Sequence, residues 1–91
     1  MKFEWDRTKA VSNLKKHGVS FVEAETVFGD AFAAIFLDEG HSVEEKREII
    51  VGYSDRGRLL VISFTERADE IIRIISARRA DPEERRNHEN G

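Results

Sequence analysis

Arginines gather in the last third of the chain at a spacing that suits contact with phosphate groups. Arg67 lies in a predicted loop and Arg73 within the strand that follows it, and Arg78 and Arg79 end that strand. Pairing of adjacent hairpin strands would bring Arg67 near Arg73 and place Arg78 toward the other end of the ladder. A guanidinium stays charged at any working pH and matches two phosphate oxygens at once. The group is therefore a candidate phosphate site, whereas a salt bridge to a nearby acid explains any single arginine more simply.

Lys16 and His17 stand at the predicted end of the first helix. His17 could act as a general acid or base near neutral pH. The alternative, which the sequence favours, is a histidine stabilised by the helix dipole and half packed against Leu14. Lys9 and Lys16 are seven residues apart, which places them on one side of the helix, where a solvated surface is the default role.

Several kinds of catalytic site are absent from the sequence. The chain has no cysteine, which excludes thiolate chemistry and zinc–thiolate sites and fits a reducing compartment. His41 and His88 have no ligand partner at metal spacing, and no histidine pair of the HExxH kind occurs. Ser63 and Ser76 lack the context of a catalytic triad, and there is no glycine-rich phosphate loop. We therefore expect neither a metal nor a cofactor.

Composition bounds the class of protein. The 91 residues correspond to one domain, 1–91, with 40% apolar residues for its core and 36% charged residues. The formal net charge of −3 argues against a protein that coats nucleic acid or reads DNA directly. No apolar run approaches the roughly 18 residues of a membrane span, and the N-terminus lacks a signal-peptide core. We expect a cytoplasmic protein that contacts no membrane.

The elements that must position these residues begin at the N-terminus. Residues 3–5 suit a short edge strand, and Asp6 is a good N-cap for a helix that runs through Lys16. Gly18 supplies the left-handed residue at which such a helix ends. The residues expected to share one face of this helix are Ala10, Leu14 and His17.

Two further helices have clear start signals. A second helix is predicted over residues 21–28, and Ser20 and Glu23 form the pattern of a capping box at its start. The last helix opens at Asp81-Pro82, where Asp81 is the N-cap, and Glu84 completes a similar pattern.

Four strands with turn signals between them are predicted between the second and last helices. They cover residues 31–38, 47–54, 58–65 and 70–78. A hairpin turn and short loops, one of them at 66–69, join these strands, so an antiparallel meander is expected. The predicted fold class is therefore α+β, with two N-terminal helices, a four-stranded antiparallel sheet and a C-terminal helix.

Segments at both ends of the chain resemble the BrnT family of toxins from prokaryotic type II toxin–antitoxin pairs. KHGVSF at 16–21 and RIISARRA at 73–80 are specific when they occur together. The stretch from 31 to 45 matches mostly in pattern. The other matching positions are Phe3-Glu4-Trp5-Asp6, Lys9, Asn13, Ala24, Val27-Phe28, Arg47, Gly52 and Glu84-Arg85.

This resemblance implies a RelE-like fold and a ribonuclease that blocks translation. It also implies neutralisation by a cognate BrnA-type antitoxin, which would resemble ribbon-helix-helix proteins and carry the pair to operator DNA. Contact with DNA would then be indirect, and RNA would be the substrate. Hetero-oligomers of toxin and antitoxin, with toxin dimers among them, are the expected assemblies.

The implied reaction is metal-independent cleavage in which the RNA's own 2′-hydroxyl is the nucleophile. The protein must hold the phosphate in line, stabilise its growing charge and move two protons. The residues expected to be catalytic are His17, Glu66, Arg67 and Arg78, and those expected to bind RNA phosphates are Lys16, Arg73 and Arg79. Lys16, His17, Arg67, Arg73 and Arg78 are expected to meet on one exposed patch. The alternative function is a catalytically inactive RelE-like binding module that serves as antitoxin partner and co-repressor.

Overall fold

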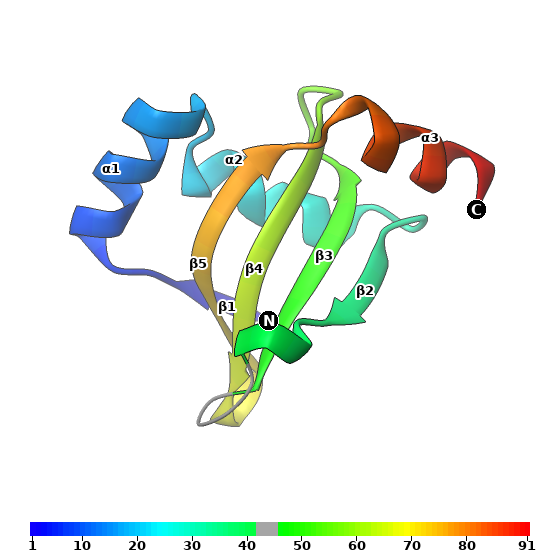
Figure 1. Ribbon diagram of the computed structural model, residues 1–91. Coiled ribbons are helices and arrows are strands. Elements are labelled where there is room, and N and C mark those ends of the chain that lie inside the picture. Colours follow the sequence, from blue (N-terminus) through cyan, green and yellow to red (C-terminus); the bar gives the residue numbers. More distant parts are fainter. Residues whose placement is uncertain (42–45) are drawn as a thin grey trace.

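A five-stranded sheet forms the centre of the structure, a computed structural model that describes residues 1–41 and 46–91. Its strands lie side by side in the order β1-β5-β4-β3-β2 (Figure 1). All neighbouring strands are antiparallel except β1 and β5, which run parallel. The strands are β1 (Lys2–Glu4), β2 (Ala34–Leu37), β3 (Arg47–Tyr53), β4 (Leu59–Arg67) and β5 (Ile71–Arg79).

The α+β class is confirmed, but the predicted four-stranded antiparallel sheet is wrong. The sheet is mixed because the short N-terminal strand adds to it, with Phe3 opposite Ile72 and Glu4 opposite Arg73. The short edge strand expected at residues 3–5 is present as β1, but its partner β5 lies at the far end of the chain, and this pairing was not predicted. The meander from β2 to β5 is antiparallel, as predicted.

Helices cover the two faces of the sheet unequally. In Figure 1 the helix α1 (Arg7–His17) lies to the left of the strands, beside β5, and the helix α2 (Phe21–Glu25) lies behind them and continues into the 3₁₀ turn η1 (Thr26–Gly29). The helix α3 (Pro82–Asn90) lies at the end of the sheet where β5 stops, and none of its residues is buried. In the described residues, no helix has both the length and the apolar character needed to cross a membrane.

The core lies between the sheet and the pair α1–α2. Alternate residues of β3, β4 and β5 point into it, and the residues between them point to the opposite face. The alternation along β5 is interrupted once, where its register against β4 shifts between Ser63 and Phe64. Rings from the N-terminus complete it, because Trp5 packs edge-on against Phe21 and Phe3 lies against Phe28. Its buried members are Val19, Phe21, Ala24, Val27, Ile50, Leu60, Ile62, Phe64, Ile72, Ile74 and Ala77.

Most of the predicted caps are present. Asp6 accepts a hydrogen bond from the backbone of Lys9, and Gly18 ends α1 with a φ of 68°. The capping box of Asp81 and Glu84 is complete. Ser20 caps α2 through the Glu23 amide, but the Glu23 carboxylate does not complete that box, because it binds Ser54 and Arg58 instead.

The face of α1 that turns toward the core matches the prediction only in part, because Ala10 packs against the core but Leu14 does not. Leu14 is 51% exposed, whereas Asn13 is buried. The Asn13 amide donates to the carbonyls of Val19 (3.0 Å) and Ala77 (2.8 Å) and accepts from the Ala77 amide (3.1 Å). Since β1 pairs only with the first part of β5, Asn13 satisfies backbone groups that would otherwise lie at an open sheet edge.

Element boundaries also shift. The strand predicted at 31–38 begins only at Ala34, because the Asp30 carboxylate first holds a turn through the Phe32 amide. The strand predicted to end at 65 continues through Arg67, so the loop that follows is the short 3₁₀ turn η3 (Ala68–Glu70). The predicted helix 21–28 splits into α2 and η1.

Candidate active site

The face of the sheet opposite α1 and α2 carries the candidate site, and we call it the outer face. Near the loop between β4 and β5 it is polar, because Arg73 lies opposite Glu4 on one side and Thr65 on the other. Arg47 of β3 lies opposite Thr65 and completes this row across four strands. One step along β4, Ser63 lies opposite Ser76. This end of the outer face therefore offers guanidinium, hydroxyl and carboxylate groups side by side.

Glu4, Arg67 and Arg73 form a cluster in this polar region, which we call the Glu4 cluster. Arg73 Nη1 donates to Glu4 Oε2 at 2.7 Å, and Arg67 Nη1 lies 3.9 Å from the same oxygen. The Glu4 side chain is 38% exposed and that of Arg67 is 51% exposed. Solvent reaches the cluster, so an incoming anion can reach both guanidinium groups.

Strand alternation explains why these residues meet. Phe3 and Trp5 pack against the core, so Glu4 between them points to the outer face. Arg73 stands between the buried Ile72 and Ile74 and points the same way. The extension of β4 beyond its predicted end is what carries Arg67 to the cluster, opposite Ile71.

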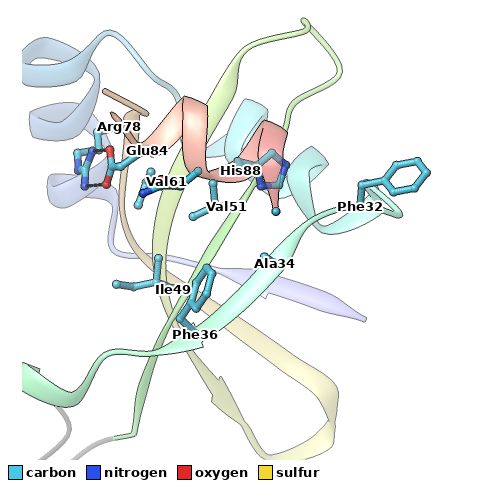
Figure 2. A pocket seen from close by; sticks show the side chains of 11 residues that line it. Phe32, Ala34, Phe36, Ile49, Val51, Val61, Arg78, Glu84 and His88 are labelled. Atoms are coloured by element: carbon cyan, nitrogen blue, oxygen red, sulfur yellow. Dashed lines mark hydrogen bonds and ion pairs between the residues drawn. The ribbon is translucent and has the colours of Figure 1, made fainter. Parts of the chain in front are cut away.

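An apolar pocket of about 640 Å³ occupies the other end of the outer face, under α3. Figure 2 shows Val51 and Val61 in the middle of it, Phe36 and Ile49 below, and the pair Arg78–Glu84 at one end. Pockets of this size commonly hold small ligands. Phe36 stands three strands away from Ser76 in the row Phe36, Ile49, Ser63, Ser76, so the pocket adjoins the polar region.

Arg78 forms the salt bridge that the sequence had offered as the simpler explanation. Its Nη1 and Nη2 donate to the two oxygens of Glu84, both at 2.8 Å. These bonds hold the pKa of Glu84 down at about 2, with help from the Asp81 amide and against the effect of burial. The carboxylate in turn raises the pKa of Arg78. The pair thus fastens α3 to β5.

The remaining candidate residues lie at both ends of the sheet. The end of α1, with Lys16 and His17, lies beside the start of β4, because Arg58 donates to the Gly18 carbonyl at 3.1 Å. Arg67 ends the same nine-residue strand, which spans about 27 Å. The structure therefore separates Lys16 and His17 from the Glu4 cluster, and the expected single patch is not formed.

Arg79, Glu66 and Arg78 also lie apart from the cluster. Arg79 pairs with the buried Leu60 and Glu66 with the buried Ile72, so both point to the helix-covered side. Arg78 shares the outer face with Arg73. The two arginines are about 13 Å apart along the ladder, because Arg78 pairs with Val61 of β4 whereas Arg73 pairs with Thr65.

Glu4 is the site residue that the sequence analysis did not single out for chemistry. Its signal was the alternation Phe3-Glu4-Trp5, in which a charged residue stands between two rings. That alternation places Glu4 on the face away from the core as soon as the segment is a strand. Its arginine partners become visible only when the segment is paired with β5.

A second carboxylate–arginine cluster is structural. Glu23 is buried, with 4% of its surface exposed. It binds Arg58 through both oxygens and accepts from the Ser54 hydroxyl at 2.7 Å. The Arg58 hydrogen bonds lower the pKa of Glu23 although burial acts against them. Within the described residues no group of three His, Asp or Glu side chains could hold a metal ion.

Comparisons with known proteins bear on the family and the fold of the chain. Residues 5–84 match the family model described as the ribonuclease toxin BrnT of type II toxin–antitoxin systems. Among solved structures, the chain is similar to the 1.1 Å crystal structure of the Brucella abortus ribonuclease toxin, BrnT, with 25% sequence identity and a TM-score of 0.69. That match covers 89% of this chain and 97% of the other. No curated protein matches the chain.

Proposed function

Because the chain belongs to the BrnT family of ribonuclease toxins of type II toxin–antitoxin systems, as its motifs predicted, we propose that it is an endoribonuclease whose reaction centre is the Glu4 cluster. The observation that carries the proposal is the placement of Arg67 and Arg73 beside one carboxylate oxygen on an exposed sheet face. With the Glu4 carboxylate between them, the two guanidinium groups leave one net positive charge, which matches the single negative charge of an RNA phosphodiester.

The cluster suits cleavage by the RNA's own 2′-hydroxyl, without a metal. Negative charge grows on the phosphate as the 2′-oxygen attacks, and Arg67 and Arg73 would stabilise it through fixed donors. A neighbouring base would lie toward the apolar pocket, where Phe36 offers an exposed ring for stacking. Roles for Lys16, His17, Glu66, Arg78 and Arg79 in binding or proton transfer stay predictions.

The partners follow from the family. A type II toxin is paired with an antitoxin, and we propose a BrnA-type protein that binds this chain in a hetero-oligomer and carries it to DNA. RNA is the proposed substrate, and its cleavage in the cytoplasm would inhibit translation.

The test combines growth with purified RNA. Induced expression of the wild-type chain should arrest growth, and co-expression of the cognate antitoxin should restore it. The purified chain should cleave a defined RNA oligonucleotide in the presence of EDTA and leave the fully 2′-O-methylated form of that oligonucleotide intact. Harmless expression together with no cleavage would overturn the proposal and leave a catalytically inactive antitoxin partner as the function.

A further inference from the structure

Three carboxylates that hold arginines differ in whether they could still accept a proton. Both oxygens of Glu23 are bonded, to Arg58 and Ser54, and the side chain is buried. Both oxygens of Glu84 are bonded to Arg78. Each oxygen of these two carboxylates already accepts a hydrogen bond from an arginine, so neither carboxylate has an unengaged oxygen to offer a substrate.

Glu4 is engaged through one oxygen only. Arg73 and Arg67 both approach Oε2, and in the part of the chain that the structure describes no hydrogen bond reaches Oε1. The side chain stands on the exposed outer face. Glu4 therefore presents a carboxylate oxygen that is open to solvent and adjacent to two phosphate-binding groups.

The cluster also retains donors for a phosphate. Arg67 Nη1 lies 3.9 Å from Glu4 Oε2, beyond hydrogen-bond distance, so its N–H groups can turn to an incoming anion. A phosphate held by Arg67 and Arg73 would lie against Glu4. The 2′-hydroxyl on the ribose that carries that phosphate would then stand next to the open oxygen.

We propose that Glu4 is the general base of the cleavage, an inference that rests on the proposed ribonuclease function. The 2′-oxygen bonds to phosphorus as its proton passes to Glu4 Oε1. The bond from phosphorus to O5′ breaks with its electron pair on O5′, which takes a proton from water. The hydroxide left behind takes the proton back from Glu4, and the products are a 2′,3′-cyclic phosphate and a 5′-hydroxyl.

The alternative role for Glu4 is to hold β1 against β5. The backbone ladder between these strands and the rings of Phe3 and Trp5, which pack against Phe28 and Phe21, already fix the strand. Glu4→Gln keeps the size of the side chain and an oxygen that can accept from Arg73, but it cannot take a proton. This variant therefore separates the two roles.

The test measures single-turnover cleavage of an RNA oligonucleotide that the wild-type chain cuts, at saturating protein. Glu4→Gln should lower the rate constant about 10²–10³-fold, whereas Glu89→Gln on the exposed side of α3 should leave it unchanged. Binding of the 2′-O-methylated oligonucleotide and the melting temperature should stay the same for both variants. Glu4→Ala should regain activity in proportion to added formate, because a small carboxylate can occupy the vacated site.

The outcomes separate the inference from the function it rests on. An active wild-type chain with a Glu4→Gln rate within about threefold of it would overturn the role of Glu4 alone. A rate loss matched by weaker binding or a lower melting temperature, without formate rescue, would also overturn it, because Glu4 would then be structural. A wild-type chain that cleaves no RNA would overturn both.

Discussion

Arg73 and Glu4 bind each other across 69 positions of the chain, with Arg73 Nη1 2.7 Å from Glu4 Oε2. The bond joins β1 and β5, which are the first and last strands along the chain and neighbours in the sheet. It lies on the face that the helices α1 and α2 leave uncovered. It also joins two stretches that resemble the BrnT family, Phe3-Glu4-Trp5-Asp6 and RIISARRA at 73–80. Arg67 lies beside the same oxygen, and the three side chains form the cluster that we propose as the phosphate site.

Asn13 should contribute strongly to stability although it is polar. Asn13→Ala removes three hydrogen bonds and leaves the buried N–H and C=O groups of Ala77 without partners. We expect the free energy of unfolding to fall by about 2–3 kcal/mol, measured by urea denaturation.

Leu14→Ala is the matched control on the same helix. Since Leu14 is half exposed, its truncation should cost well under about 1 kcal/mol. A larger loss for Leu14→Ala than for Asn13→Ala would show that the apolar face predicted from the sequence is the one that packs against the sheet.

Arg58 should contribute much more to the free energy of unfolding than Arg56, although both lie near Glu23. Arg58→Ala leaves the buried Glu23 carboxylate without its main partner, which should cost about 3 kcal/mol. Arg56 is exposed and lies 3.7 Å away, so Arg56→Ala should cost less than about 1 kcal/mol. Equal losses in urea denaturation would contradict the buried pair as the tie between α2 and the β3–β4 hairpin.

The pair Arg78–Glu84 should make stability depend on acid pH. The pKa of Glu84 is about 2 in the folded chain against an ordinary value of 4.5. The pair therefore stabilises the fold fully above about pH 4.5, and this contribution is lost as the pH falls toward about 2. Because both side chains are partly exposed, we expect about 1 kcal/mol at neutral pH.

The check is the free energy of unfolding against pH for the wild-type chain and for Glu84→Gln. The two curves should differ at pH 7 and converge as the pH approaches 2. A constant difference over that range would mean that Glu84 acts through its shape and its cap on α3 and not through its charge.

Local sequence signals predicted most of the elements and several of the helix caps. Gly18 and the box of Asp81 and Glu84 act through neighbours a few residues away, and the structure confirms them. The meander from β2 to β5 followed from short loops between apolar runs. Such features depend on interactions between residues that are close in the chain, so they can be predicted from a single sequence.

The rest depends on contacts between distant parts of the chain. Glu23 has the spacing of a capping residue, but its carboxylate binds Arg58 of the β3–β4 hairpin instead. Leu14 has the apolar character of a core residue, but Asn13 is the residue that turns inward, because it binds the backbone of Ala77 at the open edge of β5. Glu4 acquires its two arginines only through the pairing of the first and last strands, which local sequence signals do not predict.

The central claim is that the Glu4 cluster performs the reaction, and single-turnover RNA cleavage by the double variant Arg67→Ala/Arg73→Ala tests it most directly. Arg86→Ala, which removes an exposed arginine from α3, is the matched control. The account predicts a rate constant at least about 10³-fold below wild type for the double variant, an unchanged rate for the control and folded protein in both cases. A folded double variant that cleaves RNA at the wild-type rate would contradict it.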